Sequence, residues 1–328
     1  MQTLKAILLA ATCVLAAPAT GAAQADKYPS KPITVLVPYV PGGATDYAAR
    51  LVAEKAKAAL GQNIIIENKA GAGGVIALEA LAAAKPDGYT LMIGNVSTNA
   101  ITPILFAKRL TVDYEKAVVP VARLLVTPSV FVVNASFASR SFKEFIDYAQ
   151  QNPGKVRYGT TGIGSFPHFD MEKLARKFEL DLIHIPYKGG AGEMIKGLIS
   201  GDVQAGSTNA VLGVSLRDSG KIIPLATNMP ERLKELPDVP TFTEHGLPGH
   251  GTQNWSGLFA PAGTPPEVIK TLYEAFTNAA KDPELLQMAA KSGTFGFAAG
   301  SHDEVQTWLK AELAKWRETV AQIKLDLN

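Results

Sequence analysis

Cysteine is nearly absent from this sequence. Cys13 is the only one in 328 residues, and it lies in the apolar N-terminal stretch. The residues just before it match a lipidation box poorly. The chain beyond this point therefore has no disulfide, no cysteine nucleophile and no thiolate metal site. The histidines are scattered without metal-ligand spacing, so we expect neither a metal nor a cofactor.

An excess of charge of one sign is also lacking. The 32 basic and 30 acidic residues leave a formal net charge of +2, and no block of basic residues occurs. A nucleic-acid partner is therefore not expected. After the N-terminal stretch, no apolar run is long enough to span a bilayer, so we expect no stable membrane insertion.

The N-terminus carries the pattern of an export signal. Lys5 precedes the apolar residues 6–15, and Ala23-Gln24-Ala25 fits a small-x-small cleavage site. This order predicts a signal peptide over residues 1–25 and export of the rest of the chain. A buried N-terminal helix is the alternative interpretation of the same apolar run.

Beyond residue 25, apolar strands alternate with helices, which is typical of an α/β protein with mostly parallel sheets. The remaining length, about 300 residues, exceeds one compact core. We predict one lobe from residues 26–127 and 250–328 and a second lobe from residues 128–249. Two crossings of the chain would form a hinge with a ligand cleft between the lobes. Strands are expected at 33–38, 63–68, 89–94, 129–133, 156–158, 182–186, 203–207 and 222–227. Helices are expected at 46–60, 75–84, 142–151, from after Ser165 to about 178, and at 191–200, 265–281, 283–292 and 302–320.

Two glycine-rich loops each follow a strand and open a helix, one in each predicted lobe. They span residues 37–46 and 158–168. Glycines let backbone N–H groups approach a ligand, and a helix start adds unpaired N–H groups and a partial positive charge. Such loops bind anions without an arginine, and hydroxyl groups of Thr45, Thr160, Thr161 and Ser165 would add donors. Ordinary turn chemistry explains either loop taken alone.

Several further segments accompany these loops in a fixed order. They are residues 28–33, 67–74, 85–91, 152–155, 186–190, 237–241 and 260–265. Together they resemble the periplasmic receptors of tripartite tricarboxylate transporters, also called Bug-type receptors, over nearly the whole exported chain. The resemblance implies a type II periplasmic-binding-protein fold, in which the two loops clamp one carboxylate, partly through ordered waters.

The resemblance and the neighbouring polar side chains give a set of candidate ligand contacts. Asp46 is expected to cap its helix, because an anion there would repel a carboxylate. Lys188 is a candidate ion-pair partner and Tyr187 a stacking surface. Thr208 and Asn209 lie where family members often carry an acidic or aromatic residue, so this departure leaves the ligand unnamed. The complete set is Tyr39, Pro41, Gly42, Gly43, Ala44, Thr45, Asn95, Ser97, Thr98, Thr160, Thr161, Gly164, Ser165, His168, Tyr187, Lys188, Thr208 and Asn209.

The favoured function is a monomeric solute receptor that captures a small carboxylate and delivers it to the membrane subunits of a tripartite transporter. Di- and tricarboxylates, aromatic acids and acidic amino acids are the candidate ligands. A receptor that serves a membrane signalling kinase is one alternative. An exported hydrolase with Ser165 as nucleophile and His168 as base is another, although helix capping and ligand contact explain the pair better, and we expect no enzyme.

Overall fold

A computed structural model describes residues 28–187, 190–296 and 301–325. The predicted signal peptide, residues 1–25, and Lys188 lie outside the described residues. In the described part, no helix combines the length and the apolar character needed to cross a membrane.

The first sheet has six strands in the order β11-β4-β10-β3-β1-β2. β1 pairs in parallel with β2 and with β3, whereas β10 runs antiparallel to both β3 and β4. β-Branched and aliphatic residues fill β1, whose sequence Ile-Thr-Val-Leu-Val is buried along most of its length. The strands are β1 (Ile33–Val37), β2 (Ile64–Asn68), β3 (Thr90–Asn95), β4 (Val118–Thr127), β10 (Asn254–Pro261) and β11 (Phe295–Gly296).

The second sheet has five strands in the order β7-β6-β8-β5-β9. β6 is parallel to β7 and β8, and β5 is antiparallel to β8 and β9. Both sheets are therefore mixed, and the prediction of mostly parallel sheets is wrong. In the first sheet the reason is that β4 leads the chain toward the second sheet and β10 leads it back, so these two strands run in opposite directions. The strands are β5 (Ser129–Asn134), β6 (Val156–Thr160), β7 (Leu182–Pro186), β8 (Ala205–Asn209) and β9 (Ile222–Thr227).

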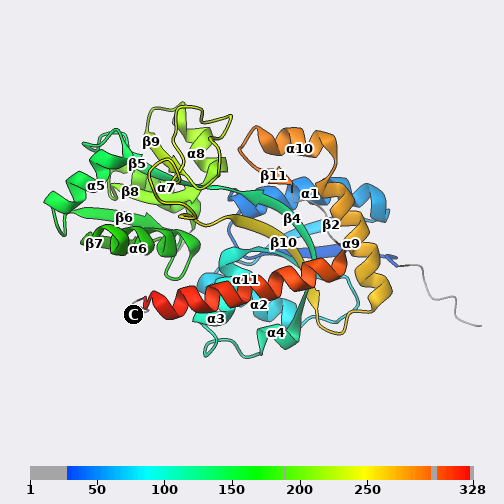
Figure 1. The fold of residues 1–328 in the computed structure, drawn as a ribbon. Coiled ribbons are helices and arrows are strands. Elements are labelled where there is room, and N and C mark those ends of the chain that lie inside the picture. Colours follow the sequence, from blue (N-terminus) through cyan, green and yellow to red (C-terminus); the bar gives the residue numbers. More distant parts are fainter. Residues whose placement is uncertain (1–27, 188–189, 297–300, 326–328) are drawn as a thin grey trace, which may run out of the picture.

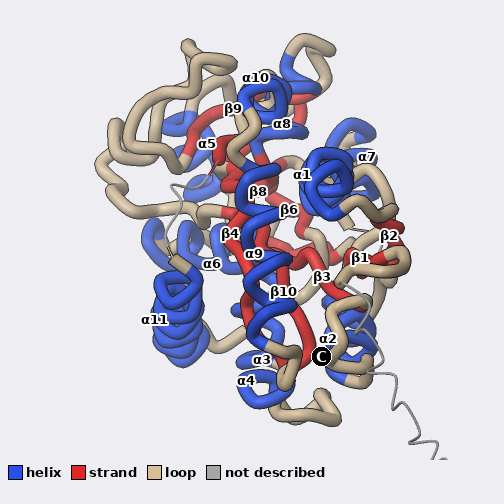
Figure 2. The backbone as a smooth tube through the Cα atoms, turned by 90° about the vertical axis from the view of Figure 1, so that its right-hand side faces the viewer, coloured by secondary structure: helices blue, strands red, loops and turns tan. Residues whose placement is uncertain are grey.

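Helices cover both sheets from outside (Figures 1 and 2). In the first lobe, α1 and α9 pack on one face of the sheet and α2 and α11 on the other. The helices beside the first sheet are α1 (Ala44–Leu60), α2 (Val75–Ala82), α3 (Thr102–Leu105), α4 (Tyr114–Ala117), α9 (Pro266–Ala280), α10 (Pro283–Ala290) and α11 (His302–Gln322); those beside the second are α5 (Phe142–Gln151), α6 (Phe166–Phe178), α7 (Ala191–Ser200) and α8 (Ala210–Arg217).

Most predicted elements are present, and the omissions have physical causes. The bounds of α5, α7, β7 and β9 agree with the prediction, and Ser141 caps α5 by accepting a hydrogen bond from the N–H of Glu144. Strand β4 was not predicted, and its interior contains Pro120, a residue that is uncommon inside strands. In the structure, Pro120 pairs with Phe259 at a register shift, where a missing ladder donor is tolerated.

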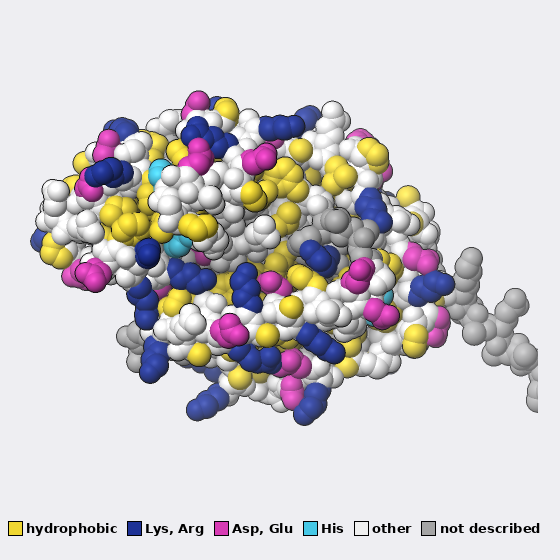
Figure 3. Space-filling view, in the orientation of Figure 1, with side chains coloured by type: hydrophobic (Ala, Val, Ile, Leu, Met, Phe, Trp, Pro, Cys, Tyr) yellow, Lys and Arg dark blue, Asp and Glu magenta, His cyan; other side chains and the backbone are white. Residues whose placement is uncertain are grey.

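The chain crosses between the sheets at two places. The first crossing is Pro128, between β4 and β5, and the second lies just before β10. On one side of the molecule the lobes also pack directly, because Phe169 of α6 meets Trp316 of α11 with ring centroids 5.3 Å apart. On the face drawn in Figure 3, acidic and basic side chains are interspersed. We propose the division into lobes at residues 127/128 and 249/250.

Asp170 of α6 holds the second crossing against the second lobe. Its buried carboxylate accepts hydrogen bonds from the hydroxyl group of Thr252 at 2.7 Å and from the N–H of Thr252 at 3.2 Å. It also accepts one from the hydroxyl group of Ser207 on β8 at 3.0 Å. The carboxylate therefore ties the crossing to α6 and β8.

Replacing Asp170 by Ala is expected to lower the free energy of unfolding by about 3 kcal/mol, because buried donors of Thr252 and Ser207 lose their acceptor. Asp170→Asn keeps one acceptor oxygen and is expected to lose less. Urea unfolding measures both, with Asp238→Ala, a substitution of an exposed aspartate, as control. Equal stability of Asp170→Ala and the unaltered protein would contradict this role.

Candidate functional site

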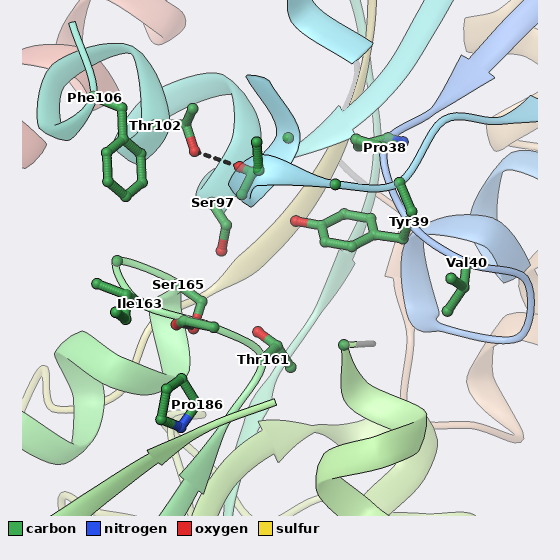
Figure 4. Close-up of a pocket in the computed structure, with 18 of the residues that line it drawn as sticks. Pro38, Tyr39, Val40, Ser97, Thr102, Phe106, Thr161, Ile163, Ser165 and Pro186 are labelled. Atoms are coloured by element: carbon green, nitrogen blue, oxygen red, sulfur yellow. Dashed lines mark hydrogen bonds between the residues drawn. The ribbon is translucent and has the colours of Figure 1, made fainter. Parts of the chain in front are cut away.

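A cleft of about 510 Å³ lies between the lobes. Figure 4 shows Pro38, Tyr39, Ser97 and Phe106 on one side, facing Thr161, Ile163, Ser165 and Pro186 on the other. The first set belongs to segments beside the first sheet, and the second set to segments beside the second sheet. The remaining lining residues are Val40, Ala70, Gly71, Ala72, Gly73, Gly74, Thr102, Arg109, Gly162, Gly164 and Gly190.

A smaller pocket of about 110 Å³ adjoins this cleft and shares Tyr39, Val40, Ser97, Thr161 and Gly190 with it. Its other residues come mainly from two helix starts, at α1 and α7. They are Pro41, Gly42, Gly43, Ala44, Thr45, Asn95, Phe166, Ala191, Gly192, Asn209 and Asn254. No aspartate or glutamate lines either space within the described residues.

Helix α1 begins at the smaller pocket without a side-chain cap. Its N-cap residue is Gly43, which offers no side-chain acceptor. Within the described residues, the N–H groups of Ala44 and Thr45 have no hydrogen-bond acceptor. The positive end of a 17-residue helix therefore faces the pocket with open donors.

The prediction that Asp46 caps α1 is wrong, because its carboxylate contacts groups other than the first N–H groups of the helix. Its carboxylate accepts a hydrogen bond from the N–H of Gly42 at 3.0 Å and from Asn68 at 2.9 Å, and it pairs with Arg50 at 2.9 Å. Burial raises the pKa of Asp46, but the hydrogen bonds and charge of Arg50, with those from Asn68 and Gly42, outweigh burial and hold the pKa below its usual value. The carboxylate is thus ionised and already neutralised, and it shapes the loop before α1.

Asn95, at the end of β3, fixes the first-lobe wall. Its amide oxygen accepts hydrogen bonds from the Tyr39 hydroxyl group and the Ser97 N–H, both at 2.9 Å. Its amide nitrogen donates to the hydroxyl group of Thr45 at 2.9 Å. Burial, opposed in part by hydrogen bonds, raises the pKa of Tyr39 to about 12, so its ring stays uncharged. One side chain thus joins the end of β3, the start of α1 and the loop between β1 and α1.

On the second lobe, α7 supplies the open helix start. Its N-cap residue is Gly190, and the N–H groups of Ala191 and Gly192 have no acceptor within the described residues. Helix α6 differs, because its first N–H, on Phe166, donates to the Ser97 hydroxyl group of the first lobe at 3.0 Å. The facing pair of open helix starts is therefore α1 and α7, whereas the α6 start forms a contact between the lobes.

Two stacked histidines contact the loop of residues 160–165. The rings of His168 and His184 lie 3.8 Å apart. His168 Nδ1 accepts a hydrogen bond from the N–H of Gly164 at 3.2 Å, and His184 Nε2 lies 2.7 Å from the hydroxyl oxygen of Thr160. Burial, with the neighbouring His184, lowers the pKa of His168 to about 3, and burial lowers the pKa of His184 to about 4. Both rings are neutral near pH 7.

The structure brings most of the predicted contacts to the two spaces and leaves others behind the walls. Thr98, Thr160, His168 and Thr208 are buried and line neither space, and Tyr187 packs over Gly197. Lys188 lies outside the described residues. The predicted contacts in the lining are Tyr39, Pro41, Gly42, Gly43, Ala44, Thr45, Asn95, Ser97, Thr161, Gly164, Ser165 and Asn209.

Sequence reasoning missed other lining residues. The loop of residues 70–74 and the start of α7 are glycine-rich and follow strands, so the same signal was present there. Phe106 and Arg109 follow the short helix α3 and carry no local motif.

Ser165 and His168 do not form a nucleophile and base. The Ser165 hydroxyl group donates to the carbonyl oxygen of Gly162 at 2.7 Å, while His168 Nδ1 is occupied by the N–H of Gly164. Within the described residues, no three histidine, cysteine or acidic side chains gather to hold a metal ion.

Comparison with known proteins gives one consistent result. Residues 48–325 match the model of the tripartite tricarboxylate transporter family receptor. BugT of Bordetella pertussis is 31% identical, with 96% of each chain covered. MatC of Rhodopseudomonas palustris, solved with bound malate, has a TM-score of 0.83 and 31% identity, covering 89% of this chain and 100% of its own. A second R. palustris protein, solved with adipate, has a TM-score of 0.84 and 29% identity, covering 90% of this chain and 97% of its own.

The two buried histidines predict how stability depends on pH. Their folded pKa values, about 3 and 4, lie below the value near 6.5 of an unfolded histidine. Between these values the unfolded chain binds more protons, so stability is full above about pH 6.5 and falls as the pH drops toward 4. One such group contributes a slope of up to about 1.4 kcal/mol per pH unit.

Urea unfolding between pH 7 and pH 4.5 tests this dependence. His168→Gln is expected to show a shallower loss of stability in acid than the unaltered protein, and His302→Gln, a variant of a distant histidine, an unchanged loss. Parallel curves for all three proteins would contradict the assignment to His168.

Proposed function

Because the chain belongs to the tripartite tricarboxylate transporter receptor family, whose members are periplasmic solute-binding proteins, we propose that it captures a small carboxylate between its lobes for a tripartite transporter. The cleft is the capture site, and the membrane subunits of the transporter are the partners that receive the ligand. The export pattern of residues 1–25 supports a place in the periplasm.

The observation that carries the proposal is the pair of open helix starts at one pocket. Ala44 of α1 and Ala191 of α7 belong to different lobes and line the same space. Their N–H groups have no acceptor within the described residues, and no acidic side chain of the described residues is in the pocket lining; Glu193, in the first turn of α7, lies outside it. A carboxylate offers two oxygens, each able to accept more than one hydrogen bond, so it satisfies donors from both helices at once.

Magnitudes favour the use of both helices. A hydrogen bond to a charged group contributes roughly 1.5–3 kcal/mol. Two or three from one helix give roughly 3–9 kcal/mol, whereas association costs roughly 4–15 kcal/mol. A micromolar site needs about 8 kcal/mol net. One helix start alone therefore holds a carboxylate weakly, and useful affinity requires donors from both lobes.

Neutral polar groups complete the pocket. Asn209 and Asn254 line it together with Thr45, and all three side chains are buried. The Asn209 side chain accepts the N–H of Leu212 and so fixes the start of α8 at the wall. Neutral donors avoid the large desolvation cost of a buried counter-ion. The malate and adipate carried by two structural relatives are carboxylates of the kind this pocket would accept.

Thermal unfolding with added ligand tests carboxylate capture. A ligand that binds only the folded protein raises the midpoint by mass action. We expect at least one acid among malate, citrate, adipate, terephthalate, benzoate and glutamate to raise it, and uncharged sugars to leave it unchanged. A shift with sugars alone would refute the proposal.

Ala44→Pro tests the backbone donors directly. Proline at the first helical position removes one N–H while preserving the helix, so affinity for the captured acid is expected to fall about tenfold. Ala44→Gly keeps the N–H and serves as the matched control. Thr161→Val, which removes a lining hydroxyl group from the other lobe, is expected to weaken binding as well. Calorimetric titration measures the affinities, and equal binding by Ala44→Pro and Ala44→Gly would count against the helix-start mechanism.

A further inference from the structure

Arg109 is the one charged side chain in the lining of the two spaces within the described residues. It lies in the turn after α3, where its N–H donates to the carbonyl oxygen of Phe106 at 2.8 Å. The side chain is exposed, and in the described part of the chain its guanidinium group pairs with no carboxylate. Its charge is therefore available at the mouth of the larger cleft.

An aromatic ring holds this guanidinium group in place. Arg109 Cζ lies 4.8 Å from the centroid of the Phe106 ring. A guanidinium group stacked on an aromatic face keeps its in-plane N–H groups free for a carboxylate, and its flat fork matches the two oxygens. Phe106 therefore orients the cation without using its donors.

Phe106 in turn is fixed between loops of both lobes. A Cβ atom added to Gly73 or to Gly164 would lie 3.4 Å from atoms of the Phe106 ring. Both glycines have positive φ angles, +65° and +74°, so the two loops approach the ring in a conformation that other residues rarely adopt. The stack of Arg109 on Phe106 consequently lies at the junction of the two lobes.

The lining has a cationic feature at each of two separate places. Figure 4 shows Phe106 and Val40 toward opposite ends of the cleft, with Ser97 and Tyr39 between them. Val40 also lines the smaller pocket with the α1 and α7 starts, whereas Phe106 and Arg109 line only the larger space. Apolar groups, such as Ile163, lie in the larger space that contains Arg109.

The size of the cleft argues for a ligand that reaches both places. A volume of about 510 Å³ lies within the range of roughly 300–1,000 Å³ that is typical of small-molecule sites. A longer or aromatic diacid fills more of the cleft and covers its apolar wall.

We propose that Arg109 is a specificity-determining residue of the larger cleft, which binds the second acid group of a dicarboxylate whose acid groups are separated by an apolar chain or ring. This inference rests on the proposed function, because the first carboxylate is the one captured at the helix starts. Arg109 then selects among carboxylates, and monoacids bind without its contribution.

Calorimetric titration with matched probes tests the role of Arg109. Adipate and terephthalate are each compared with their monomethyl esters, which keep the size but remove one charge. The unaltered protein is expected to bind at least one diacid about tenfold or more tightly than its monoester. Arg109→Ala is expected to remove this preference while binding the monoester as before, and Arg109→Lys to retain part of it. Lys108→Ala, which removes one positive charge outside the lining, is expected to behave like the unaltered protein.

Three results would overturn the inference. They are equal binding of diacids and monoesters by the unaltered protein, an undiminished preference in Arg109→Ala, and an equal loss of preference in Lys108→Ala. Carboxylate capture itself survives each of these results, because it is judged by the wider acid panel. Failure of all four probes to bind would also overturn the inference, and only failure of the whole panel would remove the proposed function.

Discussion

The structure depends on how the backbone N–H groups at two helix starts are satisfied. Each helix leaves its first donors unpaired, and glycine at the N-cap of α1 and α7 supplies no side-chain acceptor. At α6 the Ser97 hydroxyl group of the other lobe accepts the first N–H, and at α8 the Asn209 side chain serves as the cap. Helices α1 and α7, whose first N–H groups have no acceptor within the described residues, line one pocket from opposite lobes, and the proposed anionic ligand would accept hydrogen bonds from both.

Hydrogen bonds and a stacked histidine pair hold the walls of the cleft around the two helix starts. Asn95 joins Tyr39, Thr45 and the turn after β3 on one lobe, and the neutral pair of His168 and His184 supports the facing loop on the other. None of these groups brings a net negative charge to the pocket. Preorganised neutral dipoles bind an anion without the reorganisation that flexible charged side chains require. Arg109 adds a full charge to the lining of the larger cleft, where its exposed side chain stays in contact with water and avoids the desolvation cost of a buried charge.

Local sequence signals predicted much of this protein. Strand-loop-helix patterns with glycines identified the α1 start and its loop, and Ser141 identified the start of α5, because these features depend on neighbouring residues alone. Strand β4 was not predicted, and the register shift against β10 at which Pro120 is accommodated depends on residues far away in the sequence. Three features arise from tertiary packing, so no local pattern reveals them. They are the shared pocket of the α1 and α7 starts, the hydrogen bond from the Phe166 N–H to the Ser97 hydroxyl group, and the stack of Arg109 on Phe106.

A crystal structure of the protein grown with a carboxylate that raises its unfolding midpoint tests the central claim most directly. We expect the carboxylate oxygens within hydrogen-bonding distance, about 2.7–3.2 Å, of backbone nitrogens at the starts of both α1 and α7, directly or through one ordered water. A bound acid held only by side chains elsewhere, with both helix starts facing bulk water, would contradict the account.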